Sequence, residues 1–410
     1  MVGFPKPAAN VCLSMSAIDQ IDWPSLKTAY GTAIDAPRHV RALISGSSQE
    51  QDVALNYLWN HMWHQGSRYT ASPFVVPFLF EALEQAERDQ ARFINLILAI
   101  AVGLDESFLP KGYIFAVEAA QLASEGWGNL FRCEAEKESY LAVSKQADAL
   151  TAFVGSHFDA ECRLSAGFAL AHFAETLGTS RTDVRAALES ERDPIQITNL
   201  LLCLGLLERH ASNDRRLSLI EAHLSNRSRT VQLAAAIALA TVSESSLCST
   251  GLQILLAALS DAWVLDIPQR RWNWWNEGDL LGYAAKACTL VGHEEQVLEA
   301  LGNALLKAPR STFALQYSLL GIAFPDEKPP SGRDPKDFTP SQQRAVKALI
   351  DSRRWTSWMI DEYFLPTGLT GRPFFKALQS FLAWFGAKID DKDGLRRSGN
   401  VSSWNHEQGI

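Results

Sequence analysis

The sequence lacks the features that mark secreted and membrane proteins. Its six cysteines lie far apart without a CxxC pair, which argues against a disulfide framework and for a reducing compartment. No apolar run reaches about 18 residues, so we expect no membrane span. The N-terminal residues contain no apolar core of signal-peptide length. These absences together predict a cytoplasmic protein.

Positive charge is also scarce. The chain has 38 lysines and arginines against 46 aspartates and glutamates, a net charge of -8. Nucleic-acid backbones are bound through a concentrated positive surface, whereas the arginines between residues 181 and 229 are interleaved with acidic residues. We therefore expect no nucleic-acid partner.

Helical periodicity, by contrast, runs through most of the chain. Neither strand alternation nor an Asn-Gly hairpin signal occurs over a useful length. A short helix is predicted within 22–31, and the capping box Ser47-x-x-Glu50 starts a helix that runs to about His64. Ser228 marks another helix start. The sequence therefore predicts an all-α fold.

The helical segments recur with a period of about 34 residues. Aligned positions Leu170, Leu204 and Leu239 are separated by 34 and 35 residues. Two helices per period predict an α-solenoid, because a single helical hairpin cannot bury its apolar face and its neighbours must share one core. The expected organisation is a loosely ordered N-terminus (1–20), a single solenoid (21–387) and a mobile tail (388–410).

The repeats resemble HEAT-like repeats in several details. They share the aspartate-proline start, an arginine early in the second helix (Arg163, Arg229) and an A-x-A-L core. The segments H-Q-G-S-R-Y-T-A at 64–71, V-P-F-L at 76–79 and T-P-S-Q-Q-R-A-V-K-A-L at 339–349 are similar to a family of microbial HEAT-like repeat proteins. The resemblance implies a helical-repeat fold and a cytosolic location, and it carries over no biochemical role.

One irregular stretch, Asp261–Asp279, breaks the repeats and carries four tryptophans. Pro268 and alternating polar residues exclude a simple buried helix, and long irregular loops in compact folds are often functional. The rings either fill the gap that the insertion makes or line the concave side of the array as a ligand-binding wall. The ligand-binding candidates here are Trp263, Trp272, Trp274, Trp275, Arg270 and Arg271, and the catalytic candidates are Asp266 and Glu277.

Polar residues in the first half of the chain form a second candidate set. His64 lies four residues after Asn60 and eight after Asn56, so the three are predicted to share one helix face. His64 is the natural proton shuttle if chemistry occurs, and Asn56, Asn60 and Tyr69 are ligand-binding candidates. The alternative is that His64 caps a helix that ends with Gly66 in the left-handed conformation.

Asn95 and Asn199 occupy the same place in two matching segments, I-N-L-I-L-A-I at 94–100 and T-N-L-L-L-C-L at 198–204. Both are ligand-binding candidates if their helices line the inner surface of the array. The alternative is a structural bond from the side chain to the backbone.

Metal chemistry has little support in the sequence. Some HEAT-like hydroxylases bind iron through paired His-Glu motifs, whereas here such dipeptides occur only at His293-Glu294 and His406-Glu407. The sequence also has no glycine-rich phosphate loop and no G-x-S-x-G elbow. We expect neither a metal nor a cofactor.

Two functions remain open. The first is a helical-repeat protein that binds a protein, a peptide or a small apolar molecule in a tryptophan-rich groove. The second is a stand-alone, cofactor-independent enzyme of the cyclase, pericyclase, isomerase or lyase type, as in natural-product biosynthesis, whose pocket shapes an apolar substrate. The enzyme predicts a closed pocket of roughly 300–1,000 Å³, whereas the binding protein predicts a long open groove.

Overall fold

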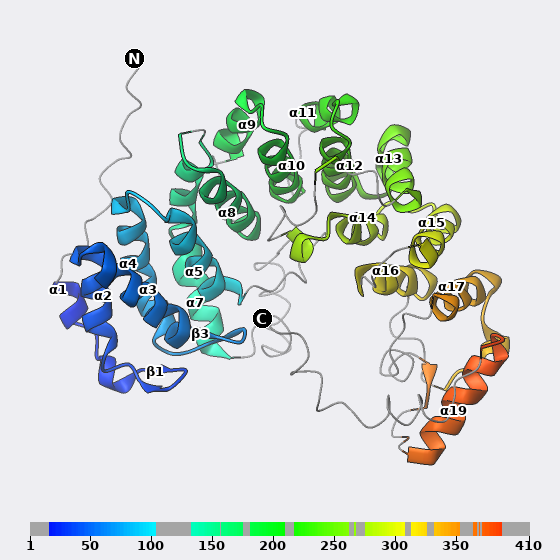
Figure 1. The fold of residues 1–410 in the computed structure, drawn as a ribbon, viewed down its shortest axis with the longest axis horizontal. Coiled ribbons are helices and arrows are strands. Elements are labelled where there is room, and N and C mark those ends of the chain that lie inside the picture. Colours follow the sequence, from blue (N-terminus) through cyan, green and yellow to red (C-terminus); the bar gives the residue numbers. More distant parts are fainter. Residues whose placement is uncertain are drawn as a thin grey trace. The chain divides into compact units, whose positions relative to one another are not determined.

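The computed structural model is built almost entirely of helices (Figure 1). It describes residues 16–103, 133–155, 157–174, 181–209, 217–261, 266–267, 275–307, 313–325, 332–352, 364–366, 369 and 371–387. These residues confirm the all-α prediction. None of the helices among them is long and apolar enough to cross a membrane. The chain divides into two compact units, Met1–Ile220 and Glu221–Ile410.

The first unit joins helices with two short antiparallel hairpins. Its helices are α1 (Ser16–Asp19), α2 (Ala36–Ser45), α3 (Ser48–Met62), α4 (Ser72–Gln85), α5 (Gln90–Val102), α7 (Glu134–Ser144), α8 (Ala160–Leu170), α9 (Arg181–Ser190) and α10 (Pro194–Glu208), and α11 (Leu217–Glu221) crosses the unit boundary. The hairpins are β1 (Lys27–Thr28) with β2 (Gly31–Thr32) and β3 (Trp63–His64) with β4 (Ser67–Arg68). Short 3₁₀ helices span Trp23–Ser25, Ala147–Val154 and Ala171–Phe173.

The second unit arranges its helices in two rows (Figure 1). One row is α12 (Arg229–Ser243), α14 (Leu280–Cys288) and α16 (Phe313–Ala323), and the other is α13 (Ser249–Ser260), α15 (Glu294–Lys307) and α17 (Pro340–Asp351). Each helix contacts the next member of its own row, and α13 also packs against α12 and α14. The unit further contains α19 (Gly371–Trp384) and 3₁₀ helices at Ala222–Ser225, Glu244–Ser246, Trp275–Gly278 and Pro335–Asp337.

The helix starts predicted at Ser47 and Ser228 are present. The Ser47 hydroxyl accepts a hydrogen bond from the Glu50 amide, and the Glu50 carboxylate accepts one from the Ser47 amide at 2.7 Å. The Ser228 hydroxyl accepts from the Val231 amide at 3.3 Å. These caps satisfy amides that the first turn of a helix leaves without a backbone partner.

Buried side chains fasten α10 onto α8. The Gln196 amide group donates to the Ala160 carbonyl at 3.0 Å, and the Asn199 amide group donates to the Arg163 carbonyl at 3.2 Å. Each bond joins residues 36 positions apart. Gly167 makes this approach possible, because a Cβ at that position would overlap the Asn199 amide group.

The chain departs from the sequence prediction at the two hairpins. The segment 22–31, predicted as a helix, forms a single 3₁₀ turn and then enters the β1–β2 hairpin. The helix expected to run to His64 ends at Met62. Its continuation turns back because Gln65 and Gly66 both have positive φ, 48° and 79°, as the two central residues of a type I′ turn require. Gly66 is left-handed as predicted, but it serves a hairpin and not a helix end.

Candidate functional site

The structure describes part of the tryptophan-rich stretch. Trp263, Arg270, Arg271, Trp272 and Trp274 lie outside the described residues. Asp261, Asp266 and Trp275–Asp279 lie within them, and Glu277 belongs to the 3₁₀ turn before α14. The contacts of Asp266 and Trp275 show the structural roles of the described part of the stretch.

Asp266 stabilises the start of α12. One of its carboxylate oxygens accepts hydrogen bonds from the Thr230 amide at 3.0 Å, the Thr230 hydroxyl at 2.5 Å and the Ser228 hydroxyl at 3.1 Å. Burial raises the pKa of Asp266, but these hydrogen bonds outweigh it and leave the pKa below its usual value. A carboxylate held ionised by three donors is a helix cap, so its geometry favours a structural role over the catalytic one considered from the sequence.

Trp275 packs into the interior of the second unit. Its side chain is 2% exposed, and its ring lies parallel to that of Tyr283 with the centroids 6.0 Å apart. The adjacent Asp279 caps α14 by accepting from the Gly282 amide at 2.8 Å. Trp275 therefore fills the core beside the insertion, which is the first of the two alternatives for these rings.

A cavity of about 340 Å³ lies next to Asp261, the first residue of the tryptophan-rich stretch. It is bounded by the first turn of α12, the last turns of α13 and the first turn of α14, and all three helices belong to the second unit. Its lining residues are Arg229, Gln232, Leu233, Ile254, Ala257, Ala258, Asp261 and Leu281. Asp261 is the only one of these that belongs to the stretch selected from the sequence.

The cavity combines an apolar interior with a charged edge. Leu233 and Leu281 are 1% and 9% exposed, and Ala257 and Ala258 leave space because their side chains are short. Arg229 and Asp261 are exposed, and neither side chain pairs with another described residue. Apolar walls with a few polar groups are typical of sites that bind small molecules.

The first-unit candidates do not form one site. Asn56 and Asn60 are exposed on α3, where the Asn60 amide group donates to the Asn56 carbonyl at 2.7 Å. His64 lies beyond the end of that helix, in β3, so the prediction that the three share one helix face is wrong. Tyr69 is half-buried, and its backbone amide donates to the Ser72 hydroxyl at 2.8 Å.

His64 instead ends a column of five rings that alternates imidazole and phenol. In order, the rings are His39, Tyr57, His61, Tyr30 and His64, with successive centroids 3.8, 3.9, 5.0 and 5.5 Å apart. The first two contacts are stacked, and the last two are edge-on. The Tyr57–His61 spacing of four residues places both rings on one face of α3, and that spacing was the available sequence signal.

The surroundings of His39 and His61 favour their neutral forms. The Arg38 guanidinium donates to Nε2 of His39 across 3.1 Å, so this nitrogen must carry a lone pair. Burial and the charge of Arg38 lower the pKa of His39, against an opposing effect of Asp35. Burial also lowers the pKa of His61. The column therefore resembles a structural clamp between α2, α3 and the hairpins more than a proton shuttle.

The two asparagines in matching segments differ in their surroundings. Asn199 is fully buried and bonded to the backbone of α8, which agrees with the structural alternative and removes it from any ligand surface. Asn95 is half-buried, and its buried side-chain oxygen has no hydrogen-bond partner among the described residues. The shared sequence pattern therefore does not give a shared environment.

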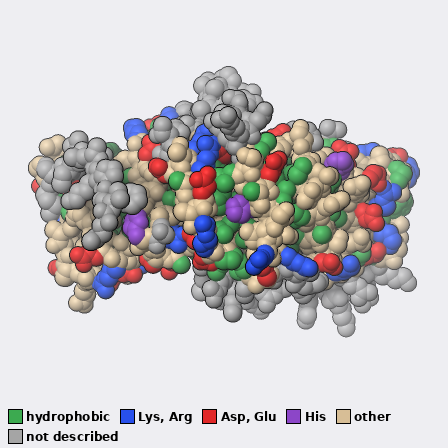
Figure 2. Space-filling view, turned by 90° about the horizontal axis from the view of Figure 1, so that it is seen from above, with side chains coloured by type: hydrophobic (Ala, Val, Ile, Leu, Met, Phe, Trp, Pro, Cys, Tyr) green, Lys and Arg blue, Asp and Glu red, His purple; other side chains and the backbone are tan. Residues whose placement is uncertain are grey.

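Surface charge and comparison with known proteins say little about what the candidate site binds. On the face drawn in Figure 2, basic and acidic side chains lie close together without a continuous positive area. Within the described ranges, no group of three or more His, Cys, Asp or Glu side chains could hold a metal ion. No protein-family model and no curated protein sequence matches this chain, so the candidate site rests on its own geometry.

Proposed function

We propose that this protein is a HEAT-like helical-repeat binding protein. Its ligand site is the cavity between α12, α13 and α14, and the ligand is a small molecule or partner side chain with an apolar body and a polar end. The observation that carries the proposal is the cavity itself. At about 340 Å³ it falls within the size range of small-molecule sites, roughly 300–1,000 Å³.

The repeat architecture has support in both units. In the first, the bonds that join α10 to α8 connect residues 36 positions apart, close to the period of the sequence. In the second, alternate helices contact one another along two rows, as stacked helical hairpins do. A single array over 21–387 is part of the proposal.

The lining favours an amphipathic ligand. An apolar ligand group that packs against Leu233, Ile254 and Leu281 is removed from water, which favours binding by about 0.8 kcal/mol for each CH₂ group buried. The unpaired Arg229 guanidinium can donate to an anionic or carbonyl oxygen at the edge. The Gln232 amide group already donates to the Asn226 carbonyl at 2.7 Å, which leaves its side-chain oxygen to accept from the ligand.

No catalytic step is assigned to this cavity. The enzyme alternative needs an aromatic wall with converging polar groups. Trp275, the one described tryptophan of the four, packs against Tyr283 and is not among the residues that line the cavity. Asp266 is engaged as a helix cap. Binding therefore accounts for the described residues with the fewest additional assumptions.

Dye binding by a cavity-filling variant tests this proposal. The probe is anilinonaphthalene sulfonate, an apolar aromatic dye with one anionic group that fluoresces in apolar sites. The folded protein should bind it saturably, and Ala258→Trp, which fills the cavity, should weaken that binding at least about tenfold. The matched control is Gln253→Trp, because Gln253 is exposed on the same helix and does not line the cavity. Equal dye affinity in the two variants would refute the site.

A further inference from the structure

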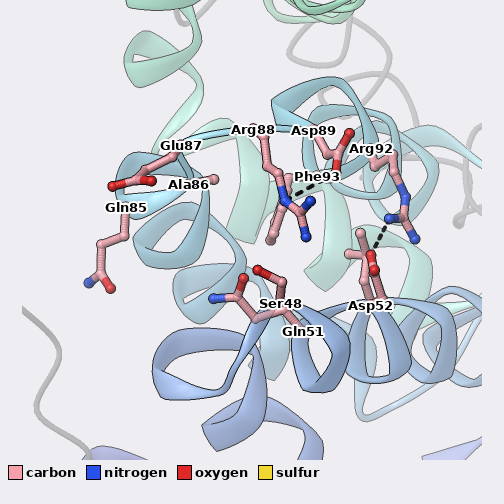
Figure 3. Close-up of a pocket in the computed structure, with 11 residues that line it drawn as sticks. Ser48, Gln51, Asp52, Gln85, Ala86, Glu87, Arg88, Asp89, Arg92 and Phe93 are labelled. Atoms are coloured by element: carbon pink, nitrogen blue, oxygen red, sulfur yellow. Dashed lines mark hydrogen bonds and ion pairs between the residues drawn. The ribbon is translucent and has the colours of Figure 1, made fainter.

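A second cavity, in the first unit, has a different chemistry. It has a volume of about 220 Å³ and lies between the first turns of α3 and the turn that joins α4 to α5 (Figure 3). Its lining residues are Ser48, Gln51, Asp52, Leu55, Gln85, Ala86, Glu87, Arg88, Asp89, Arg92 and Phe93. None of the residues selected from the sequence as site candidates is among them.

Charged side chains of both signs surround this cavity. Three lining residues are acidic (Asp52, Glu87, Asp89) and two are basic (Arg88, Arg92), so the lining has a formal charge of 2 − 3 = −1. A polyanion is therefore disfavoured, since its charge would be repelled by the excess carboxylate. An uncharged apolar ligand is disfavoured as well, because it would remove these groups from water without pairing them.

One arginine is already engaged in holding the wall together. Arg92 forms an ion pair with Asp52 at 2.5 Å and donates to the side-chain oxygen of Asn56 at 3.3 Å. These contacts join the start of α5 to α3. Arg92 and Asp52 therefore shape the cavity, and its ligand-binding groups must be sought among the others.

The remaining polar groups have unused hydrogen-bonding capacity. The nearest acidic partner of Arg88 is Asp89, at 3.9 Å, and the two side chains are 64% and 51% exposed, so this pair is weak. The side chains of Ser48 and Glu87 have no partner among the described residues. In Figure 3 the Arg88 guanidinium extends into the gap above Ser48 and Gln51.

We propose that this cavity binds a small zwitterion of the amino-acid class. The ligand carboxylate accepts hydrogen bonds from the Arg88 guanidinium and the Ser48 hydroxyl, and the ligand ammonium group lies toward the carboxylate of Glu87, which has no partner among the described residues. Charge-assisted hydrogen bonds of this kind are about twice as strong as neutral ones. Phe93, 5% exposed, provides an apolar floor for the carbon atoms of the ligand.

Isothermal titration calorimetry on the full chain tests this proposal. The probes are the twenty L-amino acids, with acetate and ethylammonium as ligands that carry one charge each. We expect saturable binding of at least one amino acid with a Kd below about 1 mM, and binding of acetate and ethylammonium at least about tenfold weaker. Absence of saturable binding by every amino acid, or equal binding of acetate, would overturn the proposal.

Two arginine variants separate this site from general charge effects. Arg88→Gln should weaken amino-acid binding at least about tenfold and leave the melting temperature unchanged, because Arg88 is exposed. The matched control, Arg227→Gln, changes an exposed arginine outside both cavities and should bind like the unmodified protein. Retention of full affinity in Arg88→Gln would also overturn the proposal. Dye binding at the cavity between α12, α13 and α14 (the α12–α14 cavity) should be the same in both variants. The two proposed sites are therefore tested independently of each other.

Discussion

The contact between Gly167 and Asn199 gives a quantitative test of how α8 and α10 pack. A Cβ added at Gly167 would overlap the Asn199 amide group and lie 3.1 Å from its Cγ. Both positions are buried. Gly167→Ala should destabilise the protein by about 1–3 kcal/mol through overpacking, partly offset by about 1 kcal/mol of better helix propensity. The bond from Asn199 to the Arg163 carbonyl, worth about 1 kcal/mol, is lost as well.

Removing the amide group should reverse the sign of this effect. Asn199→Ala alone should cost about 1–2 kcal/mol, from the lost hydrogen bond and the buried carbonyl left behind. In that background the three atoms nearest to the added Cβ, all of them in the Asn199 amide group, are gone, and Gly167→Ala should stabilise α8 by about 0.5–1 kcal/mol. The predicted coupling energy is therefore about 1.5–4 kcal/mol, well above the deviation of about 0.5 kcal/mol expected of independent sites.

Urea denaturation of the four proteins of this double-mutant cycle measures the coupling. The control is Gly321→Ala in α16, where an added Cβ has no neighbour within 4 Å and should stabilise by about 0.5–1 kcal/mol. Additive effects of the two substitutions at 167 and 199, within about 0.5 kcal/mol, would refute the proposed packing.

Two further predictions concern groups whose pKa is displaced. Asp266→Ala should lower the free energy of unfolding by about 1–2 kcal/mol in urea denaturation at neutral pH. Because the folded pKa of Asp266 is lowered, this difference from the unmodified protein should shrink as the pH falls through that pKa. An undiminished difference in acid would contradict the capping role. The folded pKa of His39 is lowered by burial and by Arg38, so the unfolded chain binds more protons and stability should fall as the pH drops below about 6.5. His39→Phe keeps an aromatic ring at this position and should reduce the fall in melting temperature between neutral and mildly acidic pH. Part of the fall should remain, because the pKa of His61 is also lowered. An unchanged fall in the variant would contradict the role of His39.

Local chemistry made the helices predictable. A hydroxyl three residues before a free amide, or a carboxylate three residues after one, caps a helix through contacts within one turn, and Ser47, Glu50 and Ser228 all cap as the sequence indicates. The β3–β4 turn was not predictable in the same way. Gln65 takes a positive φ although glutamine carries no particular preference for it, so only Gly66 hinted at the turn.

The candidate sites depend on contacts between distant segments, which a single sequence does not reveal. The burial of Asn199 follows from Gly167 on another helix, and the capping role of Asp266 follows from Thr230, 36 positions away. The α12–α14 cavity owes its space to Ala257 and Ala258, two small residues that look ordinary in a helix. The tryptophan-rich stretch indicated the neighbourhood of the cavity but not its lining.

Methyl-region NMR of the full chain, titrated with anilinonaphthalene sulfonate, tests the central claim most directly. With labelled isoleucine and leucine methyl groups, the shifts of Ile254, Leu233 and Leu281 should move together and saturate with one dissociation constant. Methyl groups in the interior of the first unit, such as those of Leu98, which is 1% exposed, should not move. Unchanged α12–α14 methyl shifts at a saturating dye concentration would contradict the proposed binding site.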